Sequence, residues 1–197
     1  MSFDLEFEKK LDELYKTFSA FDATQSDRLL RYRNIEPESA KFIAMLIRIQ
    51  QSKNILEIGT STGYSTLWLA DAAQVTGGKI TTLEIDAERS KMARQYAEDF
   101  AVVGVINFWV GDAQQFLESS HDSYDVILLD AERDEYINYW NHLKRIIHPK
   151  GGVLIVDNVI SHADQVEDFI SVVNADSNFL TTTLTLGAGL FVVVAKG

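Results

Sequence analysis

Short apolar runs alternate with longer amphipathic segments from residue 54 onward. Each run is followed by a stretch long enough for a helix, and strands that alternate with helices form a parallel sheet covered on both faces. We therefore predict an α/β fold. The five runs are NILEIG (54–59), KITTLEID (79–86), VINFWV (105–110), YDVILLD (124–130) and GGVLIVD (151–157).

The last two apolar runs follow a different rule. NFLTTTLTL (178–186) and the closing GLFVVVAKG (189–197) are separated only by the turn GAG. A connection this short favours a hairpin over a helical crossover. We expect the sheet to end with an antiparallel strand.

The first 50 residues carry a helical pattern. Pro37 suits the first turn of a helix that continues through SAKFIAMLIRIQ. These segments are predicted to be helices packed on a core of residues 51–197, so residues 1–197 are expected to form a single domain. In LEFEKKLDELYKTF the apolar positions are Leu5, Leu11, Leu14, Tyr15 and Phe18.

The amino-acid composition excludes several classes of function. The chain has 18 Lys and Arg against 29 Asp and Glu, a net charge of −11, which argues against nucleic-acid binding. The absence of cysteine excludes disulfides, thiolate metal sites and a cysteine nucleophile, and it fits a reducing compartment. No 18-residue apolar stretch or signal-peptide pattern occurs, so we expect no membrane partner and a cytoplasmic protein.

A glycine-bearing loop, LEIGTSTGYS (56–65), follows the first predicted strand. Glycines let the backbone approach a ligand there, and the start of the next helix offers N–H donors. The dinucleotide pattern G-x-G-x-x-G would need glycine at Ser61 and Tyr64, which disfavours NAD without excluding it. Glu84 ends the next strand 21 residues after Gly63, the distance at which an acid binds ribose hydroxyls. We predict a nucleotide-type site.

Polar residues also end three other predicted strands. Asp112, in GDAQQF (111–116), either caps a helix or faces an adenine. Asp130 and the pair Asp157 and Asn158 end two further strands, whose carboxyl ends share one crevice in an open α/β sheet. Two acids and an amide suit a hard cation such as Mg²⁺. Helix caps and turns are the alternative at each position taken alone.

The motifs together resemble a known family in order and spacing. The series LEIGTSTGYS, TLEID, GDA, YDVILLDAERDEY, KGGVLIVDNV and LGAGLFVVV is similar to the cation-dependent S-adenosylmethionine O-methyltransferases, typified by the catechol and caffeoyl-coenzyme A enzymes. The resemblance covers about residues 34–197. It implies a Rossmann-like class I methyltransferase fold, a doubly wound, seven-stranded, mainly parallel sheet with an antiparallel last strand.

The resemblance also implies cofactors and site residues. S-adenosyl-L-methionine would lie with its methionine end at the loop, its ribose at Glu84 and its adenine at Asp112 and Ala113. Mg²⁺ or another divalent cation would be held by Asp130, Asp157 and Asn158. The implied cofactor-binding residues are Gly59, Ser61, Gly63, Ser65, Glu84, Asp112, Ala113 and Asp130.

Arg133 departs from the family, which has a lysine there that acts as general base. Arginine holds its proton at physiological pH, so it has no free lone pair with which to act as a general base. Three interpretations of Arg133 stay open: electrostatic stabilisation of the acceptor oxyanion, recognition of an acidic acceptor, or pairing with a neighbouring acid on a solvated helix start. We take Arg133 and Asp130 as the candidate catalytic residues. The neighbouring acids are Glu132, Asp134 and Glu135.

The residues expected around the methyl acceptor also differ from those of the family. Arg33 replaces a family methionine, GAG replaces GDG, and only 30 residues separate Asp157 from Gly187, so much of the family's lid over the acceptor is missing. Arg33 and Arg133 favour an anionic, catechol-like acceptor, unless they are merely exposed charges.

The leading hypothesis is a divalent-cation-dependent O-methyltransferase acting on a small catechol-like or vicinal-hydroxyl acceptor, as a homodimer like many relatives. One alternative is a binding protein that keeps the cofactor but has weak or lost turnover. A less favoured alternative is an NAD-linked reductase, since the chain lacks a Tyr-x-x-x-Lys pair.

Overall fold

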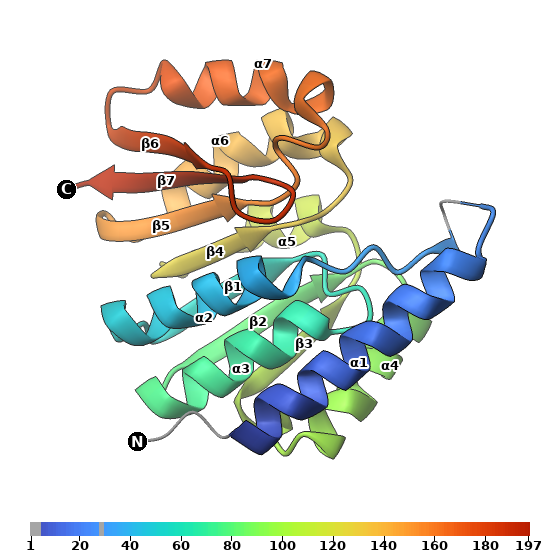
Figure 1. The fold of residues 1–197 in the computed structure, drawn as a ribbon. Helices are drawn as coiled ribbons and strands as arrows, with labels where there is room; N and C mark the ends of the chain where they lie inside the picture. The colour runs from blue at the N-terminus through green and yellow to red at the C-terminus, as the bar shows by residue number, and fades with distance from the viewer. Residues whose placement is uncertain (1–4, 28–29) are drawn as a thin grey trace.

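Seven strands form one mixed sheet in the computed structural model, which describes residues 5–27 and 30–197 (Figure 1). Their order across the sheet is β3-β2-β1-β4-β5-β7-β6. The first five strands are parallel, whereas β7 is antiparallel to both β5 and β6, between which it lies. The strands are β1 (Asn54–Ile58), β2 (Lys79–Glu84), β3 (Ile106–Val110), β4 (Val126–Leu129), β5 (Lys150–Val156), β6 (Phe179–Leu184) and β7 (Leu190–Lys196).

This arrangement confirms the doubly wound α/β fold and the antiparallel last strand expected from the sequence. The GAG turn connects β6 to β7 as a hairpin, and the pairing of Leu184 with Leu190 closes it. β7 then pairs with β5 through its other edge, so the hairpin extends the sheet beyond β5 and leaves β6 as the edge strand.

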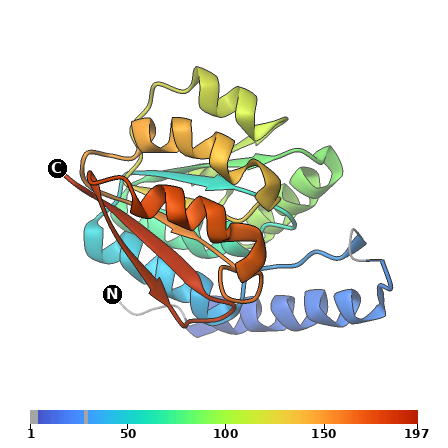
Figure 2. The same cartoon turned by 90° about the horizontal axis from the view of Figure 1, so that it is seen from above.

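Helices cover both faces of the sheet. Figures 1 and 2 show α1, α2 and α3 on one face and α5, α6 and α7 on the other. The helices are α1 (Leu5–Thr24), α2 (Pro37–Gln50), α3 (Tyr64–Thr76), α4 (Ala87–Asp99), α5 (Ala113–Ser119), α6 (Tyr136–Ile146) and α7 (Ala163–Asn174), with short 3₁₀ turns η2 (Val103–Val105) and η3 (Arg133–Glu135). None of the helices within residues 5–27 and 30–197 has the length and apolarity that crossing a membrane requires.

Strand residues alternate between two hydrophobic clusters, one on each face. In β4, Val126 and Leu128 belong to the cluster under α2 and α3, whereas Ile127 and Leu129 belong to the cluster under α6 and α7. The entire strand is buried, because both of its faces are covered. This explains why the central strands are continuous apolar runs rather than alternating ones.

The N-terminal helices pack on this core. Leu11 and Phe18 of α1 are buried in the same cluster as α2, and Pro37 is the first residue of α2, as predicted. Leu5 is 81% exposed, so the predicted apolar face of α1 was wrong at this residue. The contact with the core begins at Phe7, which packs edge-on against Phe100.

Candidate functional site

A cavity of about 960 Å³ lies over the carboxyl ends of the central strands. It extends from the ends of β2 and β3 to the end of β4, with the segment before α2 as one wall. Gly63 and Asp157 of the predicted site do not line it. The predicted site residues that do line it are Gly59, Ser61, Ser65, Glu84, Asp112, Ala113, Asp130, Arg133 and Asn158.

The glycine loop passes directly against the end of β4. Gly59 has φ +105°, and a Cβ there would collide with the carbonyl oxygen of Asp130. The N–H groups of Gly59 and Thr60 both donate to the carbonyl of Leu83, at 3.0 and 3.1 Å. Gly63, with φ +88°, has a packing role, because a Cβ there would press on Ala93 of α4. Only glycine therefore fits at these two positions.

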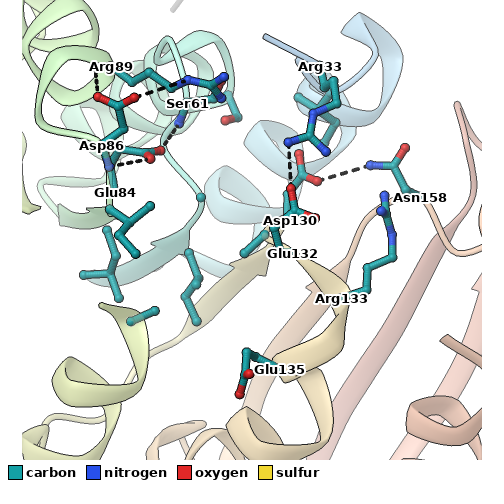
Figure 3. A pocket seen from close by; sticks show the side chains of 18 of the residues that line it. Arg33, Ser61, Glu84, Asp86, Arg89, Asp130, Glu132, Arg133, Glu135 and Asn158 are labelled. Atoms are coloured by element: carbon teal, nitrogen blue, oxygen red, sulfur yellow. Dashed lines mark hydrogen bonds and ion pairs between the residues drawn. The ribbon is translucent and has the colours of Figure 1, made fainter. Parts of the chain in front are cut away.

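Glu84 ties the end of β2 to this loop. One carboxylate oxygen accepts the N–H of Ser61 at 2.7 Å and the other accepts the N–H of Asp86 at 3.0 Å (Figure 3). The side chain lines the cavity, and each oxygen keeps a further lone pair. Glu84 can therefore accept further hydrogen bonds at the cavity wall, and its contact with a ribose stays a prediction.

Asp112 caps α5, since its carboxylate accepts the N–H of Gln114 at 2.9 Å. The helix-cap interpretation from the sequence is therefore confirmed. Asp112 and Ala113 also line the cavity, beyond Glu84. Their contact with an adenine stays a prediction.

Glu57, in the middle of β1, was missed by the sequence analysis. Its side chain is fully buried, and one carboxylate oxygen accepts hydrogen bonds from the hydroxyls of Thr66 and Thr82, both at 2.5 Å. The hydroxyl of Thr60 in the glycine loop hydrogen-bonds that of Thr82. The other Glu57 oxygen accepts no hydrogen bond from the residues that the structure describes, and burial raises the pKa of Glu57 to about 7. An acid at an inward-facing position of an otherwise apolar strand was the available signal.

Asp130 and Asp157 meet at the ends of the adjacent strands β4 and β5. The amide nitrogen of Asn158 donates to Asp130 Oδ1 at 3.2 Å and to Asp157 Oδ2 at 2.9 Å. Asn158 has φ +66°, a conformation that asparagine tolerates better than most residues, and it turns the chain back over the strand ends. The structure thus brings together the three side chains that the sequence placed 27 residues apart.

The electrostatics of this cluster favour a bound cation. Burial raises the pKa of Asp130 and of Asp157, and the charge of Asp130 raises the pKa of Asp157 further. Arg133 offsets part of the rise in the pKa of Asp130. Asp157 Oδ1 is buried and accepts no hydrogen bond from any described residue. A positive charge at this point would relieve the repulsion and give that oxygen a partner.

The donor set fits a hard divalent cation. The two carboxylates provide oxygen ligands, and Asn158 would add its amide oxygen once its side chain rotates, because its amide nitrogen now faces both carboxylates. The remaining positions would fall to water and substrate, as Mg²⁺ prefers. Within residues 5–27 and 30–197, no group of three or more His, Asp or Glu side chains has a metal-binding arrangement.

Arg133 approaches the same cluster from η3. Its Nη1 donates to Gln165 Oε1 at 3.3 Å, and among the described residues it forms no ion pair with Asp134 or Glu135. Pairing on a solvated helix start is therefore the least supported of its three interpretations. His162 also lines the cavity, with Nδ1 2.9 Å from the hydroxyl of Ser161.

The strand order, the glycine loop and the acid at the end of β2 define a Rossmann-like methyltransferase architecture. A family model described as O-methyltransferase matches residues 9–192, so the chain belongs to the O-methyltransferase family.

Individual relatives agree with this assignment. The catechol O-methyltransferase of Niastella koreensis is 32% identical over 131 residues, covering 64% of this chain and 58% of that protein. Caffeoyl-CoA O-methyltransferase 1 of Arabidopsis thaliana is 35% identical over 129 residues, covering 62% of this chain and 49% of that protein. The matched chain thus spans only about half the length of these curated relatives.

Solved structures extend the likeness across the chain. A putative O-methyltransferase from Klebsiella pneumoniae superposes with a TM-score of 0.81 and 26% identity, covering 100% of this chain and 92% of that one. The O-methyltransferase from Bacillus cereus, solved in complex with SAH, has a TM-score of 0.79 and 27% identity over 95% of this chain and 91% of that one.

Proposed function

We propose that this protein is an S-adenosylmethionine-dependent, divalent-cation-dependent O-methyltransferase that acts on a small acceptor with two adjacent hydroxyls. The observation that carries the proposal is the cluster of half-buried Asp130 and fully buried Asp157, joined by Asn158. Asp130 and Asn158 line the same cavity as Glu84. Membership of the O-methyltransferase family and the SAH complex of the Bacillus cereus protein support the choice of methyl donor.

The cavity divides into a cofactor end and an acceptor end. S-adenosylmethionine would place its methionine part against Gly59, Ser61 and Ser65 and its ribose on Glu84, with the adenine toward Asp112. The left-handed turn at Gly59 keeps the loop close to β4, which leaves room for the sulfonium beside Asp130. Holding the two reactants in line would supply much of the rate.

Asp130, Asp157 and Asn158 would hold the cation at the acceptor end. When bound, the cation would lower the pKa of an acceptor hydroxyl that it contacts. The guanidinium of Arg133 stays protonated, so it does not serve as a general base. Arg133 instead provides a fixed positive charge, close enough to lower the pKa of Asp130, that would stabilise negative charge on the acceptor oxygen.

Methyl transfer from S-adenosylmethionine to catechol, with Mg²⁺ and with excess EDTA, tests this proposal. We expect transfer with Mg²⁺, loss with EDTA and recovery when Mg²⁺ is restored. Asp157→Asn should abolish the response to Mg²⁺, whereas Asp122→Asn in an exposed loop should keep it. Transfer that is indifferent to EDTA would contradict the cation requirement.

A second candidate function is a cofactor-binding protein with lost turnover, and arginine in place of the family lysine favours it. Tight calorimetric binding of S-adenosylhomocysteine without transfer to any member of a catechol panel would select this alternative. Binding of NADH in place of S-adenosylhomocysteine would select the reductase, which the glycine spacing and family membership disfavour.

We further propose that residues 1–197 form a single domain and that the protein is a cytoplasmic homodimer. The packing of Leu11 and Phe18 on the core supports the first point. Light scattering coupled to size exclusion would test the dimer, and limited proteolysis would test whether the N-terminal helices separate from the core.

A further inference from the structure

Two guanidinium groups from distant parts of the chain reach the acceptor end of the cavity. Arg33 lies in the segment before α2, and Arg133 lies in η3, directly after β4. Both line the cavity together with Asp130. Figure 3 shows the two side chains approaching Asp130 from different sides.

The backbone at Arg33 is held in a costly conformation. Its φ is +54°, in the left-handed region that residues with a side chain rarely adopt. The two carboxylate oxygens of Asp22, on α1, accept the N–H groups of Tyr32 at 2.7 Å and of Arg33 at 2.9 Å. The hydroxyl of Ser61 donates to the carbonyl of Tyr32 at 2.9 Å. Arg33 is thereby clamped between α1 and the glycine loop, with its side chain in the cavity wall.

Both guanidiniums keep a buried donor for which the described part of the chain supplies no acceptor. The Nε atoms of Arg33 and Arg133 are buried, and no described residue accepts a hydrogen bond from either. Leaving such donors unpaired is costly, so each guanidinium gains by turning its Nε toward an acceptor, and a ligand in the cavity that both residues line can supply one. The bond of Arg133 to Gln165 is long, at 3.3 Å, and exposed.

The existing partner of Arg33 can be exchanged. Its Nη2 lies 2.7 Å from Glu132 Oε1, but the side chain of Glu132 is 66% exposed. Exposed ion pairs contribute little, so a ligand anion could replace this contact at small cost. Glu36, another acid of the cavity, has an oxygen turned toward Gly187, beneath the loop between β6 and β7.

We propose that Arg33 and Arg133 together bind a carboxylate carried by the methyl acceptor, so that the substrates are carboxylated catechols rather than neutral or cationic ones. This inference rests on the proposed methyltransferase function. A guanidinium offers parallel N–H donors that match the two oxygens of a carboxylate, and Nε with one Nη forms such a pair. Two positive charges at the wall would also reject an acceptor with an amine.

Three acceptors that share one catechol ring and differ in the charge of the side chain test the proposal. They are 3,4-dihydroxyphenylacetate, its neutral amide and 3,4-dihydroxybenzylamine. In all three a methylene separates the variable group from the ring, so the pKa values of the ring hydroxyls stay similar. We expect KM for the carboxylate to be roughly 10- to 100-fold lower than for the amide, as charge-assisted hydrogen bonds predict. The amine should be the poorest of the three.

Variants assign this preference to the two residues. Arg33→Gln and Arg133→Gln should each reduce the ratio of the two KM values by about tenfold. Because each ratio compares the KM of two acceptors on one variant, a change that affects both KM values equally cancels, and a loss of kcat does not enter the ratio. Arg94→Gln, on the exposed face of α4 where the guanidinium lies 4.5 Å from the Phe108 ring, should keep the wild-type ratio.

The outcomes separate this inference from the proposed function. Equal KM values for carboxylate and amide, with normal transfer to both, would overturn the inference and leave the methyltransferase proposal intact. Absence of transfer to all three, despite binding of S-adenosylhomocysteine, would instead overturn the proposed function. In that case calorimetry of 3,4-dihydroxyphenylacetate against its amide still decides whether the two arginines form a carboxylate site, since equal affinities would refute it.

Discussion

Glu57→Gln should remove a large part of the pH dependence of stability. Burial raises the pKa of Glu57 from its ordinary 4.5 to about 7 in the folded protein. Between these two values the folded state keeps a proton that the unfolded chain has lost, so stability falls as the pH rises through this window. The difference between the two pKa values corresponds to about 3 kcal/mol once the pH is well above 7.

The substitution is close to isosteric and neutral at every pH. The amide oxygen of glutamine can still accept the hydroxyls of Thr66 and Thr82, so any cost of the substitution itself is independent of pH. Asp130 and Asp157 also titrate with raised pKa values, but they are present in both proteins and largely cancel in the difference. The variant should therefore gain roughly 2–3 kcal/mol relative to wild type between pH 5 and pH 8.

Urea unfolding at pH 5, 6, 7 and 8, with both proteins free of ligand, measures this difference. Glu98→Gln, on the exposed side of α4, serves as the matched control and should keep the wild-type dependence. If the difference between Glu57→Gln and wild type stays constant from pH 5 to pH 8, the reasoning is refuted, because Glu57 would then be ionised or neutral equally in both states.

Three further outcomes are expected. Mg²⁺ should raise the melting temperature of wild type but not of Asp157→Asn in thermal scans, because the cation relieves repulsion between the carboxylates of Asp130 and Asp157. Equal increases in the melting temperature of both proteins would show that the cation binds elsewhere. Arg133→Lys should retain or raise kcat, since either cation stabilises the acceptor oxygen, whereas wild-type kinetics in Arg133→Ala would exclude any catalytic role. Gly59→Ala should weaken S-adenosylhomocysteine binding at least tenfold in calorimetry, because its Cβ would displace the loop from Asp130, and unchanged affinity would show that the loop does not hold the cofactor.

The sequence by itself determined the elements and the order of the motifs. Continuous apolar runs predict buried parallel strands because such strands are covered on both faces, and the GAG turn is too short for anything but a hairpin. Strand-end acids such as Glu84 and Asp130 could be located for the same reason: the end of a parallel strand always lies at the same edge of the sheet. The apolar runs, the short turn and the strand-end acids can all be recognised within one segment of the sequence.

Only the tertiary structure decided the environment of individual side chains. Arg33 and Glu132 lie 99 residues apart, and no periodicity predicts their ion pair. Gly63 belonged to the predicted cofactor loop, yet its missing side chain accommodates α4. Glu57 was overlooked because the burial that raises its pKa, and the hydroxyls of β2 and α3 that offset part of the rise, are brought around it only by folding. Burial of a side chain and its distance from other charges depend on how the helices and strands pack against one another. The position of β7 between β5 and β6 likewise depends on pairing between strands that are distant in the sequence, which no single segment reveals.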